Sequence, residues 1–241
     1  MALRVASWNV YHGAINGVQP QTRMTNFAAY CWGLAPRVDI ISFQEVPIAM
    51  MGNLPNVVNG TGYNYLRAAG EYPAYPPGLA PATNKLGDGY AVLYNPTRVA
   101  PVGIAARGDM PFINAANFKI TEGQSQGRPP VGCVFQRTGD PTVQFNFADW
   151  HNETGAWADP AIVGLHNTYV PLAADSVIAG DFNVKAAALA ASRFPRWDAV
   201  YNNVDFILTN RTVAAVEPPL IGNYVSDAHY AIMADVAIPG F

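Results

Sequence analysis

Residues 177–183 carry the clearest chemical signal of the chain. This apolar run stops at Gly180 and then presents Asp181 and Asn183, two residues apart. In a strand, residues two apart point to the same face, so a carboxylate and a carboxamide would project together. Such a pair can accept a proton, ligate a hard cation or donate hydrogen bonds to a phosphate oxygen. An Asx-type turn explains the same residues without chemistry, so the interpretation depends on how other strands end.

Polar side chains stand at the ends of several other apolar segments. They are Asn9, Glu45, His151 and Asp205, with Asp227 and His229 where the last segment opens. Active sites of layered α/β folds collect at strand ends and in the loops beyond them. Carboxylates and carboxamides are hard oxygen donors that suit Mg²⁺, Mn²⁺ or Ca²⁺ rather than zinc. The two histidines add acid and base capacity near neutral pH.

Arg128 precedes two prolines and offers a bidentate fork for a phosphate. Together, a cation, imidazoles and a guanidinium suit in-line attack of water on a phosphoester. One group activates the water, another protonates the leaving oxygen, and the cations stabilise the added charge. His12 is expected to be a rim residue on a turn, and Asn152 and Glu153 are expected to be loop residues.

The elements that must position these side chains are many strands and few helices. Strands are expected over residues 4–10, 38–43, 63–68, 114–121, 130–136, 142–150, 203–209, 212–216 and 229–238, and one more in the run that ends at Asp181. A hairpin is expected over residues 89–94 and 99–105. Helices are expected over residues 20–35, 159–169 and 185–192. Residues 52–88 are expected to be a loop-rich excursion. This pattern predicts an α/β (α+β) domain over residues 1–241, with mixed sheets packed on each other and helices outside.

Composition limits the alternatives. The 241 residues are 50% hydrophobic, enough for a full core. No apolar run approaches the roughly 20 residues that span a bilayer, and the N-terminus lacks the pattern of a signal peptide. A soluble chain is expected, either not exported by that route or lacking its leader. The net charge of -3 argues against a broad basic nucleic-acid surface. Cys31 and Cys133 are expected to be buried free thiols, with one disulfide between them as the alternative.

Seven ordered motifs between residues 4 and about 238 resemble the endonuclease/exonuclease/phosphatase superfamily, which includes deoxyribonuclease I, abasic-site endonucleases, sphingomyelinases and inositol polyphosphate phosphatases. The motifs are Trp8-Asn9, Gln44-Glu45, Arg128-Pro129, the His151 strand, Gly180-Asp181-Phe182-Asn183, Val204-Asp205-Phe206 and Ser226-Asp227-Ala228-His229. Residues 128–132 and 159–163 are similar to the catalytic B subunit of cytolethal distending toxins. The resemblance implies a four-layer sandwich, with two mostly antiparallel sheets between outer helices.

The resemblance also implies a role for each position. Glu45 would be the main metal ligand, assisted by Asn9 and Asp227, and Asp205 would orient His229. The other implied roles are catalysis by His151 and His229, placement of water and phosphate by Asp181 and Asn183, and phosphate contact by Arg128. The last motif departs from the family's Ser-Asp-His because Ala228 intervenes. Either Asp227 or His229 is therefore out of register, and the residues after His229 favour His229 as the one in register.

The main hypothesis is a divalent-metal-dependent phosphodiesterase that acts on DNA as an endonuclease. An alternative with the same chemistry is a phosphoinositide phosphatase or a sphingomyelinase acting on a lipid headgroup. A third hypothesis, from another class, is a catalytically silent binding module. The toxin resemblance would further imply delivery subunits as partners and a secreted toxin or effector.

Overall fold

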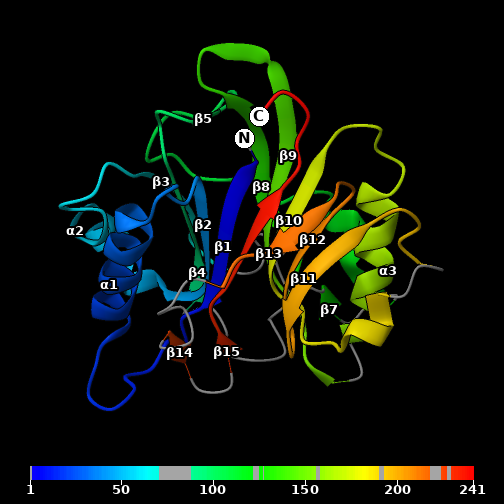
Figure 1. Ribbon diagram of the computed structural model, residues 1–241. Coiled ribbons are helices and arrows are strands. Elements are labelled where there is room, and N and C mark those ends of the chain that lie inside the picture. Colours follow the sequence, from blue (N-terminus) through cyan, green and yellow to red (C-terminus); the bar gives the residue numbers. More distant parts are fainter. Residues whose placement is uncertain are drawn as a thin grey trace.

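Two six-stranded sheets pack face to face, and helices cover the outer face of each (Figure 1). The computed structural model describes residues 2–70, 88–121, 125–126, 128–155, 158–189, 193–217, 224–226 and 229–241. The expected four-layer sandwich is therefore confirmed. No helix in these ranges is both long enough and apolar enough to cross a membrane.

Each sheet is antiparallel except for one central parallel pair, which is β1 with β2 in the first sheet and β9 with β10 in the second. The first sheet has the order β13 (Val213–Ala215), β16 (Ile232–Val236), β1 (Leu3–Asn9), β2 (Ile40–Pro47), β4 (Asp88–Tyr94) and β3 (Asn64–Ala68). The second has the order β11 (Asp198–Asn202), β12 (Asp205–Thr209), β10 (Ser176–Asp181), β9 (Asp140–His151), β8 (Val131–Arg137) and β5 (Val99–Pro101). Two short ribbons pair β14 (Val225–Ser226) with β15 (His229–Tyr230) and β6 (Lys119–Thr121) with β7 (Ser125–Gln126).

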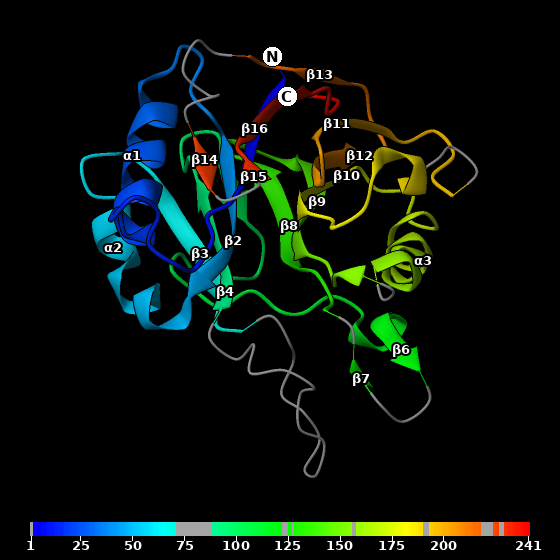
Figure 2. The same cartoon turned by 90° about the horizontal axis from the view of Figure 1, so that it is seen from below.

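The two longest helices are the crossover connections that parallel pairs require. Helix α1 (Pro20–Gly33) joins β1 to β2, and α3 (Ala158–Tyr169) joins β9 to β10. Figure 2 shows α1 and α2 (Leu54–Val57) on one flank of the sandwich and α3 on the other. Three short 3₁₀ segments complete the described helical structure: η1 (Ile48–Asn53), η3 (Ala115–Phe118) and η5 (Ala186–Leu189).

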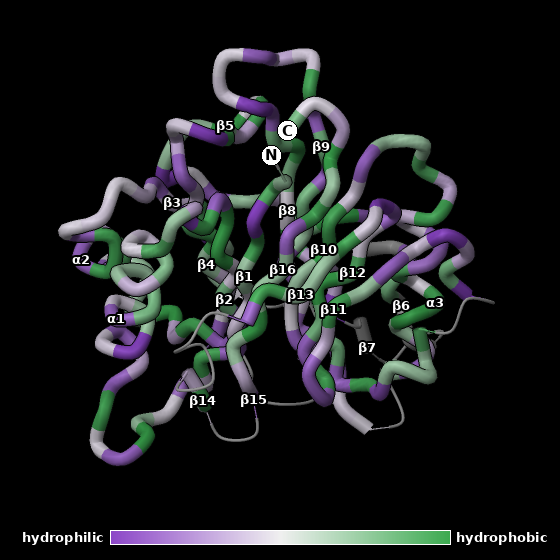
Figure 3. The backbone as a smooth tube through the Cα atoms, viewed as in Figure 1, coloured by the Kyte–Doolittle hydropathy of each residue, from purple (hydrophilic) through white to green (hydrophobic). Residues whose placement is uncertain are grey.

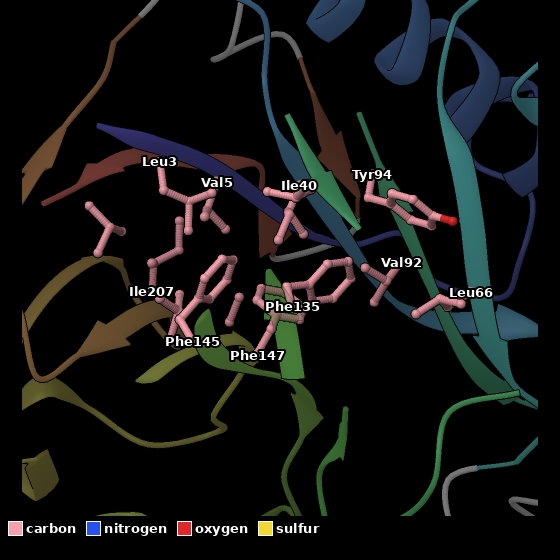
Figure 4. Close-up of a cluster of buried hydrophobic side chains, with 14 of the residues drawn as sticks. Leu3, Val5, Ile40, Leu66, Val92, Tyr94, Phe135, Phe145, Phe147 and Ile207 are labelled. Carbon is pink, nitrogen blue, oxygen red and sulfur yellow. The ribbon is translucent and has the colours of Figure 1, made fainter. Parts of the chain in front are cut away.

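Three apolar layers hold the sandwich together. The central layer lies between the sheets and includes Val5, Ile40, Phe135 and Phe147, all of them buried (Figure 4). The two outer layers join α1 to the first sheet and α3 to the second. Figure 3 shows β12, which lies between β11 and β10 in the second sheet, as largely hydrophobic, in agreement with its burial. Removal of apolar area from water is the main force that fixes the sheets against each other.

Several expected elements are wrong in detail. The segments expected as a hairpin, 89–94 and 99–105, belong to different sheets, because β4 pairs with β2 and β3 while β5 pairs with β8. The strand expected over 114–121 is the 3₁₀ turn η3 followed by the short β6, and the helix expected over 185–192 is the 3₁₀ turn η5, with 190–192 outside the described residues. Strand β11 was not expected, because its sequence, DAVYN, has only a short apolar run and ends on a polar residue. The strand is accordingly half-buried or exposed throughout.

Candidate active site

The polar side chains that end separate strands meet at one edge of the sandwich. The carboxyl ends of the strands in a parallel pair lie at the same edge of a sheet, and here Asn9 is in register with Gln44 and Asp181 with His151. The antiparallel partner of β10 begins at the same level, since Asp181 is opposite Asp205. The first sheet thus supplies one half of a cluster and the second sheet supplies the other.

One carboxylate oxygen, Oδ2 of Asp181, is the centre of this cluster. The amide Nδ2 of Asn9 donates to it at 3.0 Å. The Nε2 atoms of His151 and His229 lie 3.5 Å and 3.6 Å from the same oxygen. Asp181 itself is only 1% exposed. Two imidazoles and one amide therefore face a single buried carboxylate.

The backbone around Asp181 depends on Gly180. Its φ is +148°, and a Cβ atom there would lie 1.9 Å from the carbonyl oxygen of Trp150 on β9. Two residues later, Asn183 has a φ of +49°, and its N–H donates to Oδ1 of Asp181 at 2.9 Å. The Asx-type contact is thus present, yet it uses only Oδ1 and leaves Oδ2 toward the cluster.

Glu45 enters the cluster from a distorted position in β2. Its φ is +53°, in the left-handed region that costs a residue other than glycine roughly 1–3 kcal/mol. The pairing of β2 with β4 shifts register between Phe43 and Val46, on either side of this residue. The carboxylate then accepts from Asn9 through Oε1 at 3.1 Å and lies 3.0 Å from Nδ1 of His12 through Oε2. A strained carboxylate held in this way is typical of a functional site.

Several neighbours act on the charge of Glu45. Burial raises the pKa of this carboxyl, but the charge of His151 and hydrogen bonds from Asn9 and His12 outweigh that effect and bring the pKa below its ordinary value. Glu45 is therefore ionised at neutral pH. An ionised carboxylate is the form that binds a cation.

Asp205 and His229 form the other side of the cluster, with Nδ1 of His229 3.1 Å from Oδ1 of Asp205. Burial raises the pKa of Asp205 to about 6, although its hydrogen bond with His229 acts in the opposite direction. Burial lowers the pKa of His229, but the hydrogen bond to Asp205 and the charges of Asp181, Asp205 and Glu45 raise it to about 9. At neutral pH this imidazole therefore carries a proton that its Nε2 can donate.

The donor set fits a hard divalent cation. In two groups, Glu45–His151–Asp181 and Asp181–Asp205–His229, the ligand atoms lie within 4.8 Å of one another, and His12, Glu45 and Asp88 form a third at the rim. Carboxylates gathered this closely repel each other, so a cation between them is favoured. Asn9 presents its NH₂ to the carboxylates while its Oδ1 accepts from the N–H of Tyr11 at 3.0 Å. It would offer oxygen to a cation only after its amide rotates.

Two predicted site residues stand apart from this cluster. Arg128 is 1% exposed, and its guanidinium donates to the main-chain carbonyl of Asn152 at 3.3 Å and lies 3.8 Å from Glu153. Direct contact with a phosphate would require these interactions to rearrange, so that role stays a prediction. Asp227 lies outside the described residues.

Sequence reasoning missed other contributors. Asn152, expected to be a loop residue, is completely buried beside His151. Tyr90 accepts a hydrogen bond through its hydroxyl from the N–H of His151 at 3.3 Å, and the Ser226 hydroxyl donates to the carbonyl of Asn9. His12 does lie at the rim, with 54% of its side chain exposed, 3.3 Å from Oδ2 of Asp88. The position of Asn152 directly after His151 was the one available signal, and it does not reveal burial.

Comparisons with solved structures agree with this architecture. The human Nocturnin catalytic domain with bound sulfate anion has a TM-score of 0.67 at 15% identity, over 97% of this chain and 92% of that one. A mannosyl-6-phosphatase of Bacteroides thetaiotaomicron has a TM-score of 0.64 at 14% identity, over 98% and 100%. The D. rerio protein TDP2 complexed with single strand DNA product has a TM-score of 0.60 at 14% identity, over 96% and 97%.

At these identities the likeness shows a shared fold. No curated protein matches the chain significantly in sequence. The profile of one protein family does match, and it covers residues 6–227, nearly the whole chain and the cluster residues from Asn9 to Asp205, while His229 lies just beyond it. The chain therefore belongs to the Endonuclease/Exonuclease/phosphatase family.

Proposed function

We propose that the protein is a divalent-metal-dependent phosphodiesterase that hydrolyses DNA as an endonuclease. One observation carries the proposal: the Nε2 atoms of His151 and His229 lie 3.5 Å and 3.6 Å from the same oxygen of Asp181. This arrangement places two proton-transfer groups beside one carboxylate oxygen. Membership of a family of phosphoester hydrolases supports the same chemistry.

Each group has a role that follows from its charge. Asp181 is the acceptor that orients a water molecule and draws on its proton as the oxygen attacks phosphorus. His229, protonated at neutral pH because of Asp205, donates a hydrogen bond to the phosphate or a proton to the leaving oxygen. His151 contacts the phosphate beside Asp181. The new P–O bond forms as the opposite P–O bond breaks, and the proton lost by water is matched by the proton that the leaving group gains.

Asn183 completes the contacts to the phosphate, because its carboxamide can donate to a non-bridging oxygen. Glu45 would hold the divalent cation, with Asn9 and Asp227 as further ligands, and Mg²⁺ is the expected ion, with Mn²⁺ and Ca²⁺ as alternatives. When bound, such a cation supplies Lewis-acid stabilisation of the charge that develops on the phosphate.

DNA is the proposed substrate because the sequence motifs resemble nucleases of the superfamily and a structure of the same fold holds a DNA product. The test is nicking of supercoiled plasmid with Mg²⁺, beside an EDTA control. His151→Ala should abolish nicking while the protein stays folded. His166→Ala is the matched control, since this imidazole lies on α3 and bonds to Asn167 rather than to the cluster.

The other substrates are outcomes of the same experiment. Folded protein that does not nick plasmid but hydrolyses a phosphoinositide or sphingomyelin would overturn DNA as the substrate and keep the chemistry. Folded protein that binds no Mg²⁺ and hydrolyses no phosphoester would overturn the enzymatic proposal in favour of a binding module. Full nicking by His151→Ala would refute the role of the imidazole.

A further inference from the structure

Asn152 joins three segments beneath the cluster. It follows His151 directly and is completely buried. Its side-chain Nδ2 donates to the carbonyl of Phe182 at 2.8 Å and to the carbonyl of Ala158, at the start of α3, at 3.1 Å. Its Oδ1 accepts from the N–H of Glu153 at 2.8 Å. Both N–H bonds of the amide and its oxygen are therefore used inside the protein.

The main chain of Asn152 reaches the same segment as its side chain. Its N–H donates to the carbonyl of Asp181 at 2.8 Å. Its carbonyl accepts from Nδ2 of Asn183 at 2.9 Å. One residue thus holds the carbonyls of both Asp181 and Phe182, together with the carboxamide of Asn183. These contacts surround the peptide that leads into Asn183, whose φ of +49° lies in the left-handed region that asparagine adopts more often than most residues do.

We propose that Asn152 is a positioning residue that holds the Asn183 carboxamide in the orientation needed to contact the phosphate. The inference rests on the proposed function, which gives Asn183 that role. One N–H bond of the Asn183 carboxamide is used by the Asn152 carbonyl, so its other N–H bond can donate to a phosphate oxygen and its Oδ1 can accept from water. Without the Asn152 side chain, the Phe182 carbonyl loses its side-chain donor, so the Phe182–Asn183 peptide can shift and move the Asn183 amide away from the Asn152 main-chain carbonyl.

Arg128 also donates to the main-chain carbonyl of Asn152. Its guanidinium donates to the Asn152 oxygen at 3.3 Å from a buried position. The Arg128 guanidinium and the Asn183 amide thus donate to one carbonyl oxygen, whose two lone pairs can accept from both. Arg128 itself is fixed, because its carbonyl accepts from Nε1 of Trp150 at 2.7 Å. The arginine therefore supports Asn183 through Asn152.

The test uses Asn152→Asp, which keeps the shape of the side chain but cannot donate to the two carbonyls. We expect kcat to fall by about 10- to 100-fold, the cost of a misplaced contact group, with Mn²⁺ affinity unchanged. In an Asn183→Ala background the same substitution should cause little further loss, because the group that it positions is gone. Equal losses in both backgrounds would overturn the inference.

Asn146→Asp is the matched control. This asparagine lies on the same strand, and its amide bridges to Ser176 at 3.3 Å at the far end of the β9–β10 pair. It should lower stability without a change in kcat. If Asn152→Asp does not fold, Asn152→Ser, which keeps one donor and adds no charge, takes its place with the same expected pattern.

An NMR measurement separates this inference from the proposed function. The Nδ2 proton that Asn183 donates to Asn152 should exchange slowly with solvent in the wild type and rapidly in Asn152→Asp. If the wild type hydrolyses no phosphoester, the proposed function fails, and slow exchange would still establish that Asn152 holds Asn183. Fast exchange in the wild type would refute the positioning role whatever the activity.

Discussion

The amide of Asn9 donates a hydrogen bond of 3.0 Å to the carboxylate of Asp181, and this contact joins the first sheet to the second across the cluster. The same nitrogen donates to Glu45 at 3.1 Å. Two carboxylates from different sheets are therefore held near each other by one neutral donor. Their remaining mutual repulsion favours any cation that binds between them.

Cation binding should depend on Glu45. We expect Glu45→Gln to weaken Mn²⁺ affinity by at least about 100-fold, since even residues behind metal ligands contribute about 10- to 100-fold. Glu217→Gln, at an exposed position, should leave the affinity unchanged. Calorimetric titration or the paramagnetic resonance of free Mn²⁺ measures both variants without reference to activity. Unchanged Mn²⁺ affinity in Glu45→Gln would show that this residue is not a metal ligand.

Stability should depend on pH through His229. Its pKa in the folded protein is about 9, above the ordinary 6.5, so its stabilising contribution is complete below pH 6.5 and is lost as the pH rises toward 9. Asp205→Asn removes the partner that raises the pKa, so the imidazole should titrate at lower pH. Unfolding by urea at pH 6.5 and pH 9 should then show a smaller loss for the variant than for the wild type.

The control for this experiment is Asp140→Asn, at an exposed turn far from the cluster in sequence, where the carboxylate accepts from the N–H and the hydroxyl of Thr142. Its loss of stability between the two pH values should match that of the wild type. An NMR titration of the His229 ring gives the pKa directly. If that pKa is the same in Asp205→Asn as in the wild type, Asp205 does not hold the proton on His229.

Gly180 should tolerate no side chain. A Cβ atom there would lie 1.9 Å from the Trp150 carbonyl oxygen, so Gly180→Ala must separate β10 from β9 and should lower the free energy of unfolding by at least about 3 kcal/mol. Gly139→Ala is the control. Gly139 also has a positive φ, +85°, but a Cβ atom at this position would have no atom within 4 Å. This substitution should cost about 1–2 kcal/mol. Urea unfolding compares the two, and equal losses would mean that the close approach is not limiting.

Arg23 should hold the loop that follows β1. Its guanidinium, on α1, donates to the carbonyls of Tyr11 at 2.7 Å and Gly13 at 2.9 Å. Arg23→Met would leave these partly buried carbonyls without the guanidinium donor, so we expect a loss of about 1–3 kcal/mol in the free energy of unfolding. Arg37→Met, at an exposed position where the side chain donates to the Trp32 carbonyl, should cost under about 1 kcal/mol. A loss of stability no greater than that of Arg37→Met would show that the loop after β1 keeps its conformation without Arg23.

Much of this architecture could be predicted from local sequence. The helix expected over 159–169 is α3, and the apolar runs ending at Asn9, Glu45 and Asp181 are strands of the two central parallel pairs. A buried strand can be recognised in the sequence by its continuous run of hydrophobic residues, and the polar residues that end the run are easily identified. For this reason the residues that converge on one edge could be chosen before the structure was known.

The rest could not be read from local pattern, because it depends on tertiary contacts. Nothing in the residues between β4 and β5 reveals that the chain changes sheets there, since both strands are apolar in either arrangement. The left-handed conformation of Glu45 is imposed by the shifted register beside β4. The burial of Asn152 and Arg128 follows from the packing of three segments that are distant in sequence.

The division of the cluster between the two sheets has a consequence for misfolding. If one sheet slid past the other by a single residue, about 3.3 Å, each sheet would keep its own hydrogen bonds and the apolar layer could repack. Asn9 and Glu45 would nevertheless be carried out of reach of Asp181, because a hydrogen bond of 3.0 Å cannot span such a shift. Far-ultraviolet circular dichroism would report that slipped molecule as native. Under the proposed function, catalytic activity and cation affinity would therefore report on the alignment of the two sheets, which measurements of secondary structure cannot detect.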